Sequence, residues 1–192
     1  DLTNSDDVTK VADYIRQQCN GQLDIVMNNA GWCPVQPITE VTLADYNRAF
    51  DLDVRSVVDM TIQTLDMVMA SHGTIINLSS VGATHRATNL SMYQGAKAAI
   101  ENFTRVWALE LAEKGVRVNA IAPGAVKTNI WNVPGLTKEE SEAHEKRITA
   151  DIPMGRMAEP SEIANVAAFL ASGEASYITG AIIDVSGGAG AF

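Results

Sequence analysis

The chain has 192 residues, enough for one domain with a sizeable core, and it carries a net charge of −9. An acidic chain without a cluster of Lys or Arg is poorly suited to the phosphate backbone, so no nucleic-acid partner is expected. Its apolar stretches are too short to span a membrane, its start lacks a signal-peptide pattern, and two cysteines form no disulfide framework. We therefore expect a cytoplasmic protein without a membrane partner.

Apolar runs and helix-period patterns alternate along the chain. The elements expected, in chain order, are a helix over 8–18, a strand over 23–27, a helix over 42–70, a strand over 73–78, a helix over 90–113, a strand over 116–121, a charged helix over 138–148, a helix over 160–170 and a strand over 181–185. Apolar strands without alternation are typical of a parallel sheet that helices cover on both faces. We predict an α/β fold with a doubly wound parallel sheet, forming a single domain over residues 1–192.

The most informative spacing is that of Tyr93 and Lys97, which lie four residues apart and so project from one face of the predicted helix. An ammonium ~6 Å from a phenol favours the phenolate by roughly 2.8 kcal/mol at an effective dielectric of ~20. We therefore expect Lys97 to lower the pKa of Tyr93 towards the range of a general acid–base catalyst. Tyr-x-x-x-Lys alone more often marks a half-buried tyrosine beside a solvated lysine. Ser80 favours catalysis, because it follows a predicted strand whose carboxyl end faces the ligand crevice of such folds.

Several motifs, in order and at matching intervals over essentially the whole chain, resemble those of the short-chain dehydrogenase/reductase family in its compact single-domain branch. They are Asn28-Asn-Ala-Gly31, Ser80 with Tyr93 and Lys97, Pro123-Gly124-Ala-Val-Lys-Thr128, Gly155-Arg156 with Glu159-Pro160-Ser-Glu-Ile-Ala164, and the stretch from Ser172 to Gly188. The resemblance implies a Rossmann-like fold and an enzyme that moves hydride between a nicotinamide cofactor, NAD or NADP, and a carbonyl or secondary alcohol substrate.

The same resemblance implies roles for individual residues. Tyr93 would exchange the hydroxyl proton, Ser80 would orient the substrate oxygen, and Lys97 would assist Tyr93 and bind the nicotinamide ribose. The remaining implied cofactor-binding residues are Asp1 at the adenine, Asn28, Ala30 and Gly31 near a ribose, and Pro123, Gly124, Val126 and Thr128 around the carboxamide. For Asn28, a role in bracing the turn is an equal alternative.

Two residues depart from the family pattern. Asp53 stands where the family commonly carries an asparagine that helps hold a water in a proton relay with the lysine. Aspartate keeps the acceptors but loses the amide donors, and we hypothesise that Asp53 is catalytic and keeps the relay in altered form. The alternative is that it faces solvent or a neighbouring helix. Ser186 replaces the usual aspartate before the terminal Gly-Gly, with little expected consequence.

A further departure is the absence of the family's glycine-rich turn, which brings backbone amides to the cofactor pyrophosphate. We expect two βαβ units of about 30 residues each to precede Asp1, so that residues 1–192 form the carboxyl-terminal two-thirds of the family fold. The alternative function is a non-catalytic, truncated family member that acts as a protein-association module. A third possibility, dehydration or epimerisation by the same Tyr/Lys pair, usually needs a longer carboxyl-terminal region.

The helices over 43–70 and 90–113 are apolar on more than one side, and in the family these helices often pair between subunits, so we expect a homo-oligomer, a tetramer or dimer. Packing against the sheet is the simpler explanation for part of this surface. Residues 125–155 are expected to form a partly apolar lid over the substrate. Cys33 could line the pocket, although a role as a small packed residue is favoured. No metal site is expected, because no Cys, His and carboxylate cluster is present.

Overall fold

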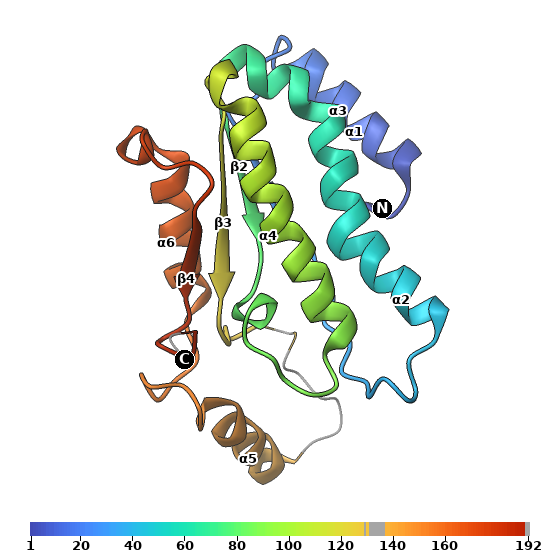
Figure 1. Ribbon diagram of the computed structural model, residues 1–192, viewed down its shortest axis with the longest axis vertical. Helices are drawn as coiled ribbons and strands as arrows, with labels where there is room; N and C mark the ends of the chain where they lie inside the picture. The colour runs from blue at the N-terminus through green and yellow to red at the C-terminus, as the bar shows by residue number, and fades with distance from the viewer. Residues whose placement is uncertain (129, 131–136, 191–192) are drawn as a thin grey trace.

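The computed structural model describes residues 1–128, 130 and 137–190, without the side chains at 138, 141 and 144. Its sheet has four parallel strands in the order β1 (Ile25–Asn28), β2 (Thr74–Leu78), β3 (Arg117–Pro123) and β4 (Ile182–Val185). The helices are α1 (Ser5–Gln18), α2 (Leu43–Phe50), α3 (Ser56–Ser71), α4 (Ser91–Leu111), α5 (Lys138–Thr149) and α6 (Pro160–Ala171) (Figure 1). The predicted α/β fold with a parallel sheet is confirmed.

Two apolar clusters hold helices against opposite faces of the sheet, because neighbouring residues of a strand point to opposite sides. Ile75 of β2 packs with Val68 of α3 and Ala108 of α4, whereas Ile76 packs with Ile163 and Leu170 of α6. Figure 1 shows α3 and α4 in front of the strands, with α1 beside α3. The carboxyl ends of all four strands therefore open towards one edge, where the segments that follow them gather.

The long helix predicted over 42–70 is divided in the structure. Thr42 caps α2 in a capping box with Asp45, as the sequence indicated. Between α2 and α3, however, residues Asp51–Arg55 form a π-helical turn, η1. A π-turn inserts an extra residue into the helical path and is found mostly at functional sites. Its central residue, Asp53, is fully buried.

At the edge strand β1, the described residues cover one face of the sheet but leave the other face exposed. Val26 of β1 is buried under α3 and α4, whereas Ile25 and Met27 point to the other face and remain 46% and 42% exposed. The segment after β3, predicted as a lid, is tied to the body at both ends: Lys127 N–H donates to the Ala158 carbonyl, and Met154 N–H to that of Gly187. Residues 129 and 131–136 of that segment lie outside the described residues.

Within the described part of the chain, no helix has the length and apolar character needed to cross a membrane.

Candidate active site

Ser80, Tyr93 and Lys97 meet at the carboxyl edge of the sheet. Ser80 follows β2 and begins a short 3₁₀ turn, where its hydroxyl accepts the Gly82 N–H at 3.1 Å. Tyr93 and Lys97 lie on consecutive turns of α4, and the Lys97 ammonium is 5.5 Å from the centre of the Tyr93 ring. The Ser80 hydroxyl lies close enough to the Tyr93 phenol to lower the pKa of that phenol by hydrogen bonding. The structure thus brings together the three residues that the sequence singled out.

Lys97 is buried among oxygen atoms. Its ammonium donates to the Leu78 carbonyl at 3.1 Å and lies 3.7 Å from Asp53 Oδ1. The same carboxylate oxygen accepts the backbone N–H of Trp32 at 2.9 Å, while Oδ2 has no hydrogen-bond partner among the described residues. Asp53 therefore does not face solvent; it joins the turn after β1, the π-turn and α4.

The protonation of Tyr93 differs from the expectation. The pKa of Tyr93 is raised to about 12: burial is the largest cause, Cys33 and Asp53 act in the same direction, and hydrogen bonding with Ser80 opposes them. The expectation that Lys97 brings this pKa down towards neutrality is therefore wrong for the protein without ligand. The physical reason is that the four-residue spacing in α4 predicts the ammonium of Lys97 near the phenol. The spacing does not show that the phenol is shielded from water, or that the carboxylate of Asp53 lies beside the ammonium.

Burial shifts the pKa values of Lys97 and Asp53 in opposite directions. It lowers the pKa of Lys97, an effect that Asp53 opposes, and it raises the pKa of Asp53, which Lys97 and the Trp32 N–H oppose. In both cases desolvation disfavours the charged form, and the partner restores it.

Asn28 braces the sheet. Its amide donates to Asn77 Oδ1 at 2.9 Å and to Thr61 Oγ1 at 3.4 Å, and the Asn77 amide donates in turn to Thr104 Oγ1 at 2.9 Å. This polar chain connects β1 with α3 and, through Asn77 of β2, with α4, the helix that carries Lys97. Of the two interpretations of Asn28, bracing matches the observed contacts. The sequence signals for Asn77 and Thr104 were a polar residue inside an apolar strand and a seven-residue spacing from Lys97 on one helix face.

Glycines allow the turns at this edge to approach closely. A Cβ on Gly31 would lie 2.5 Å from Asp53 Oδ1 and 3.3 Å from the Lys97 ammonium, and a Cβ on Gly124 would lie 2.9 Å from Ser186 Cα. The turn at Gly124 therefore packs directly against Ser186, which follows β4. Ala30 lies in the turn after β1, and Val126 pairs with Ala158 in an isolated bridge.

The remaining predicted residues lie further out. Thr128 is exposed, and its hydroxyl donates to the Val126 carbonyl at 3.4 Å. Asp1 is exposed as well, and its carboxylate accepts the N–H and hydroxyl of Thr3. Arg55 of the π-turn donates to the Thr3 carbonyl at 2.6 Å and so joins this end of the chain to the segment that carries Asp53.

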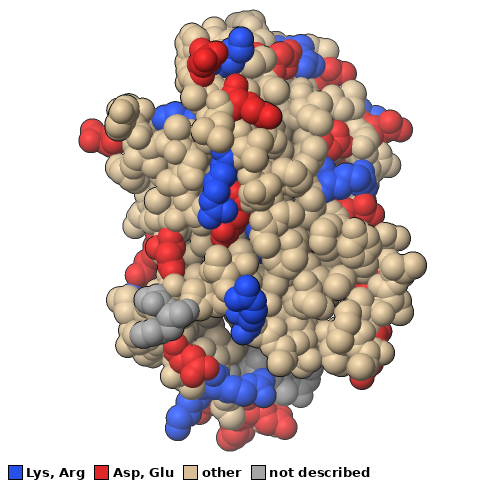
Figure 2. All heavy atoms as spheres, in the orientation of Figure 1, with Lys and Arg blue, Asp and Glu red and all other residues tan. Residues whose placement is uncertain are grey.

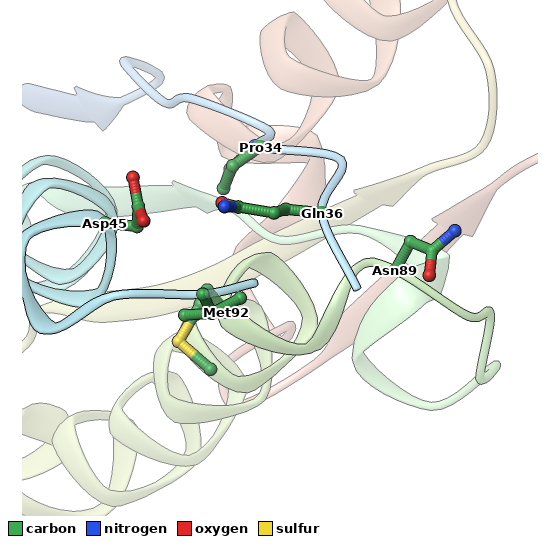
Figure 3. A pocket seen from close by; sticks show the side chains of 6 residues that line it. Pro34, Gln36, Asp45, Asn89 and Met92 are labelled. Carbon is green, nitrogen blue, oxygen red and sulfur yellow. The ribbon is translucent and has the colours of Figure 1, made fainter. Parts of the chain in front are cut away.

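A shallow hollow lies between the loop after β1 and the start of α4. Figure 3 shows Pro34 and Gln36 on one side of it and Met92 on the other. The two loops are joined there, because Gln36 N–H donates to the Asn89 carbonyl at 2.7 Å. None of Ser80, Tyr93 or Lys97 lines this hollow.

Two further residues lie beside these groups, and one of them, Cys33, was considered above as a residue that lines the pocket. Trp32 carries Arg48 of α2 stacked on its ring at 4.2 Å, and Cys33 lies close enough to Asp53 and Lys97 for both charges to act on its pKa. Both follow Gly31 directly, so their position after a strand-end turn was the available signal. Among the described residues, no group of His, Cys, Asp and Glu could hold a metal ion.

Comparison with known proteins agrees with this geometry. A family described as "Enoyl-(Acyl carrier protein) reductase" matches residues 1–190. The chain is 38% identical to hydroxynaphthalene reductase-like protein Arp2 of Metarhizium anisopliae over 198 residues, which cover 95% of this chain and 73% of that protein. The chain belongs to the short-chain dehydrogenase/reductase family.

Two further relatives of this family member are oxidoreductases by name. It is 32% identical to the 3-oxoacyl-[acyl-carrier-protein] reductase FabG of Thermotoga maritima over 188 residues, 97% of this chain and 74% of that one. Its structure resembles that of ligand-free Thermoplasma acidophilum aldohexose dehydrogenase with a TM-score of 0.94 and 29% identity, covering 100% of this chain and 77% of the other. The family and these relatives support a reductase or dehydrogenase function.

Proposed function

We propose that the protein is an NAD(P)-dependent oxidoreductase that exchanges hydride with a carbonyl or secondary alcohol. The observation that carries this proposal is the meeting of the Ser80 hydroxyl, the Tyr93 phenol and the buried Lys97 ammonium at the carboxyl edge of a parallel sheet. The serine hydroxyl and the phenol lie side by side, and in a complex each can donate its one hydrogen bond to the same substrate oxygen.

The surroundings of Lys97 suit a ligand that carries hydroxyl groups, such as the ribose of a nicotinamide cofactor. The ammonium has donors beyond the one that it gives to Leu78, and Asp53 Oδ2 is a buried acceptor without a partner among the described residues. A donor beside an acceptor matches hydroxyl groups, which act as both. We assign Lys97 and Tyr93 to the ribose, and the backbone at Ala30 and Gly31 to its neighbourhood.

The other assignments follow the positions of the segments after β1 and β3. Pro123, Gly124, Val126 and Thr128 would hold the carboxamide, and Asn28 would act through the bracing contacts described above. Asp1 would contact the adenine. NAD and NADP are both candidates, and a direct comparison of the two cofactors decides between them.

In this proposal a nicotinamide cofactor, when bound, supplies or accepts the hydride. Ser80 donates a hydrogen bond to the carbonyl oxygen and fixes its place next to the phenol. As negative charge develops on that oxygen, Tyr93 transfers its proton to it and the alcohol forms. In the reverse direction the ionised phenol takes the proton from the alcohol.

We further propose that the protein assembles as a homo-oligomer, a dimer or tetramer, through α3 and α4. Ile62, Val106 and Leu109 on these helices are 67%, 40% and 80% exposed. Figure 2 shows this face as mostly uncharged, with isolated charged side chains. Apolar residues gathered on one exposed face are typical of interaction sites.

The test is a cofactor-oxidation assay with NADH and NADPH against a panel of small ketones and aldehydes. Tyr93→Phe should abolish turnover, because the ring remains but the proton is gone. Tyr177→Phe is the matched control, since Tyr177 is fully exposed and should leave turnover unchanged. Full activity in Tyr93→Phe would overturn the assigned mechanism.

A further inference from the structure

A buried carboxylate stands at the position where the family commonly carries an amide. Asp53 is fully buried, and its Oδ1 faces the ammonium of Lys97, itself only 4% exposed. A buried charge without an opposite charge is costly, whereas the two together form a pair with no net charge. The backbone N–H of Trp32 and the π-turn hold the carboxylate in place.

Few titratable groups share this space, and they come from three elements. The turn after β1 contributes Cys33, the π-turn contributes Asp53, and α4 contributes Tyr93 and Lys97. Among the described residues, Cys33 and Asp53 are the titratable groups whose charges shift the pKa values of Tyr93 and Lys97. The charge balance at Tyr93 therefore depends on whether Asp53 cancels the ammonium.

We propose that Asp53 is the internal counter-ion of Lys97, which neutralises the ammonium and so keeps Tyr93 in its neutral, proton-donating form. An asparagine at this position would leave the field of the ammonium unopposed and favour the phenolate. Asp53 is thus a positioning and tuning residue that acts through Lys97. The catalytic consequence rests on the proposed function, but the charge balance itself can be measured without cofactor or substrate.

The directions of the shifts agree with this geometry. After burial, Cys33 and Asp53 are what raise the pKa of Tyr93, to about 12. The pKa of Cys33 is likewise raised to about 11, mainly by burial and also by Asp53, whereas Lys97 lowers it. The charge of Asp53 thus acts on both the thiol and the phenol, and Cys33, which also responds to Lys97, can report on the charge state of the pair.

The first experiment measures the alkylation rate of Cys33 by iodoacetamide at mildly alkaline pH in a Cys19→Ser background, where Cys33 is the only thiol. The thiolate is the reacting form, and well below the pKa its fraction rises about tenfold for each unit by which the pKa falls. Asp53→Asn should therefore accelerate alkylation about three- to tenfold, and Lys97→Met should slow it.

Asp51→Asn is the matched control, because it removes the same charge from the same π-turn. Asp51 pairs with Arg55 at the surface, where both side chains are 43% exposed, and its loss should leave the alkylation rate unchanged.

A second readout follows Tyr93 directly. The tyrosinate absorbance of each protein, minus that of its Tyr93→Phe counterpart, gives the titration of this one phenol. Asp53→Asn should shift that titration to lower pH, and the alkaline fall in kcat/KM for carbonyl reduction should move with it. A merely structural role would change stability, but it would not move both titrations in the same direction.

The inference is overturned if folded Asp53→Asn protein shows the wild-type alkylation rate and the wild-type Tyr93 titration, because Asp53 would then carry no charge that acts on the site. If Asp53→Asn does not fold, Lys97→Met decides: alkylation that is unchanged or faster refutes the pair. If the titrations shift but no carbonyl is reduced by any variant, the proposed function fails and the counter-ion stands.

Discussion

Replacement of Gly31 by alanine tests the geometry of the site at its tightest point. The added Cβ would lie 2.5 Å from Asp53 Oδ1 and 3.3 Å from Lys97 Nζ, well inside ordinary contact distance for the carboxylate. Asp53 is fully buried and held by Trp32 N–H, so it has little room to retreat. Overpacking of this kind costs about 1–3 kcal/mol, and here it also separates a charged pair from its hydrogen bonds.

We expect Gly31→Ala to lower the free energy of unfolding by about 1–3 kcal/mol in urea denaturation and to lower the melting temperature by roughly 2–4 °C for each of these kcal/mol. The measurement needs no cofactor, so it tests packing alone. Gly173→Ala is the control, because a Cβ there meets nothing within 4 Å and its backbone is not in the left-handed region. Equal stability of the two variants would refute the close approach of Gly31 to Asp53.

Two further predictions concern the network behind the site and the surface next to α6. Asn77→Ala should lower the free energy of unfolding by about 1–3 kcal/mol in urea denaturation, because the half-buried amide of Asn28 loses its acceptor and the buried hydroxyl of Thr104 loses its donor; an unchanged midpoint would contradict the bracing role. Hydrogen bonding with Arg156 is the largest cause that lowers the pKa of Glu162 from 4.5 to about 2 in the folded protein. As the pH falls, the unfolded chain therefore takes up this proton before the folded protein does. The stabilisation from the pair is complete above pH 4.5 and is lost as the pH falls towards 2. In Glu162→Gln, the free energy of unfolding should therefore change less with pH between about 4.5 and 2 than in the wild type. If acid denaturation shows the same pH dependence for both proteins, the Arg156–Glu162 pair is not its cause.

Most of the fold could be predicted because the local signals are strong. The buried strand β2 is an uninterrupted apolar run apart from Asn77, and the capping box of Thr42 and Asp45 fixes the start of α2. The π-turn was not predicted, since the apolar pattern over 42–70 shows where a helix faces the core but gives no sign of one extra residue in its path.

The site shows where sequence reasoning stops. The spacing of Tyr93 and Lys97 places phenol and ammonium on one face, and the structure agrees. The direction of the Tyr93 pKa depends instead on water exclusion and on Asp53, which is forty residues away along the chain and reaches Lys97 only in the folded protein. Helical spacing is local information, whereas solvation and long-range charge pairing belong to the tertiary structure.

The π-turn makes the length of the helical rod from α2 to α3 a constraint in its own right. The π-turn holds one residue more than the same stretch of regular helix, so deleting any one of residues 51–55 would close the path into a regular helix and change the positions of the residues in that turn. Ala49, now fully buried, and Asp53 could not then both keep their places. Conservative substitutions between α2 and α3 should therefore be tolerated better than the deletion of a single residue. A deletion would remove either the buried contacts of Ala49 or the contact of the Asp53 carboxylate with Lys97.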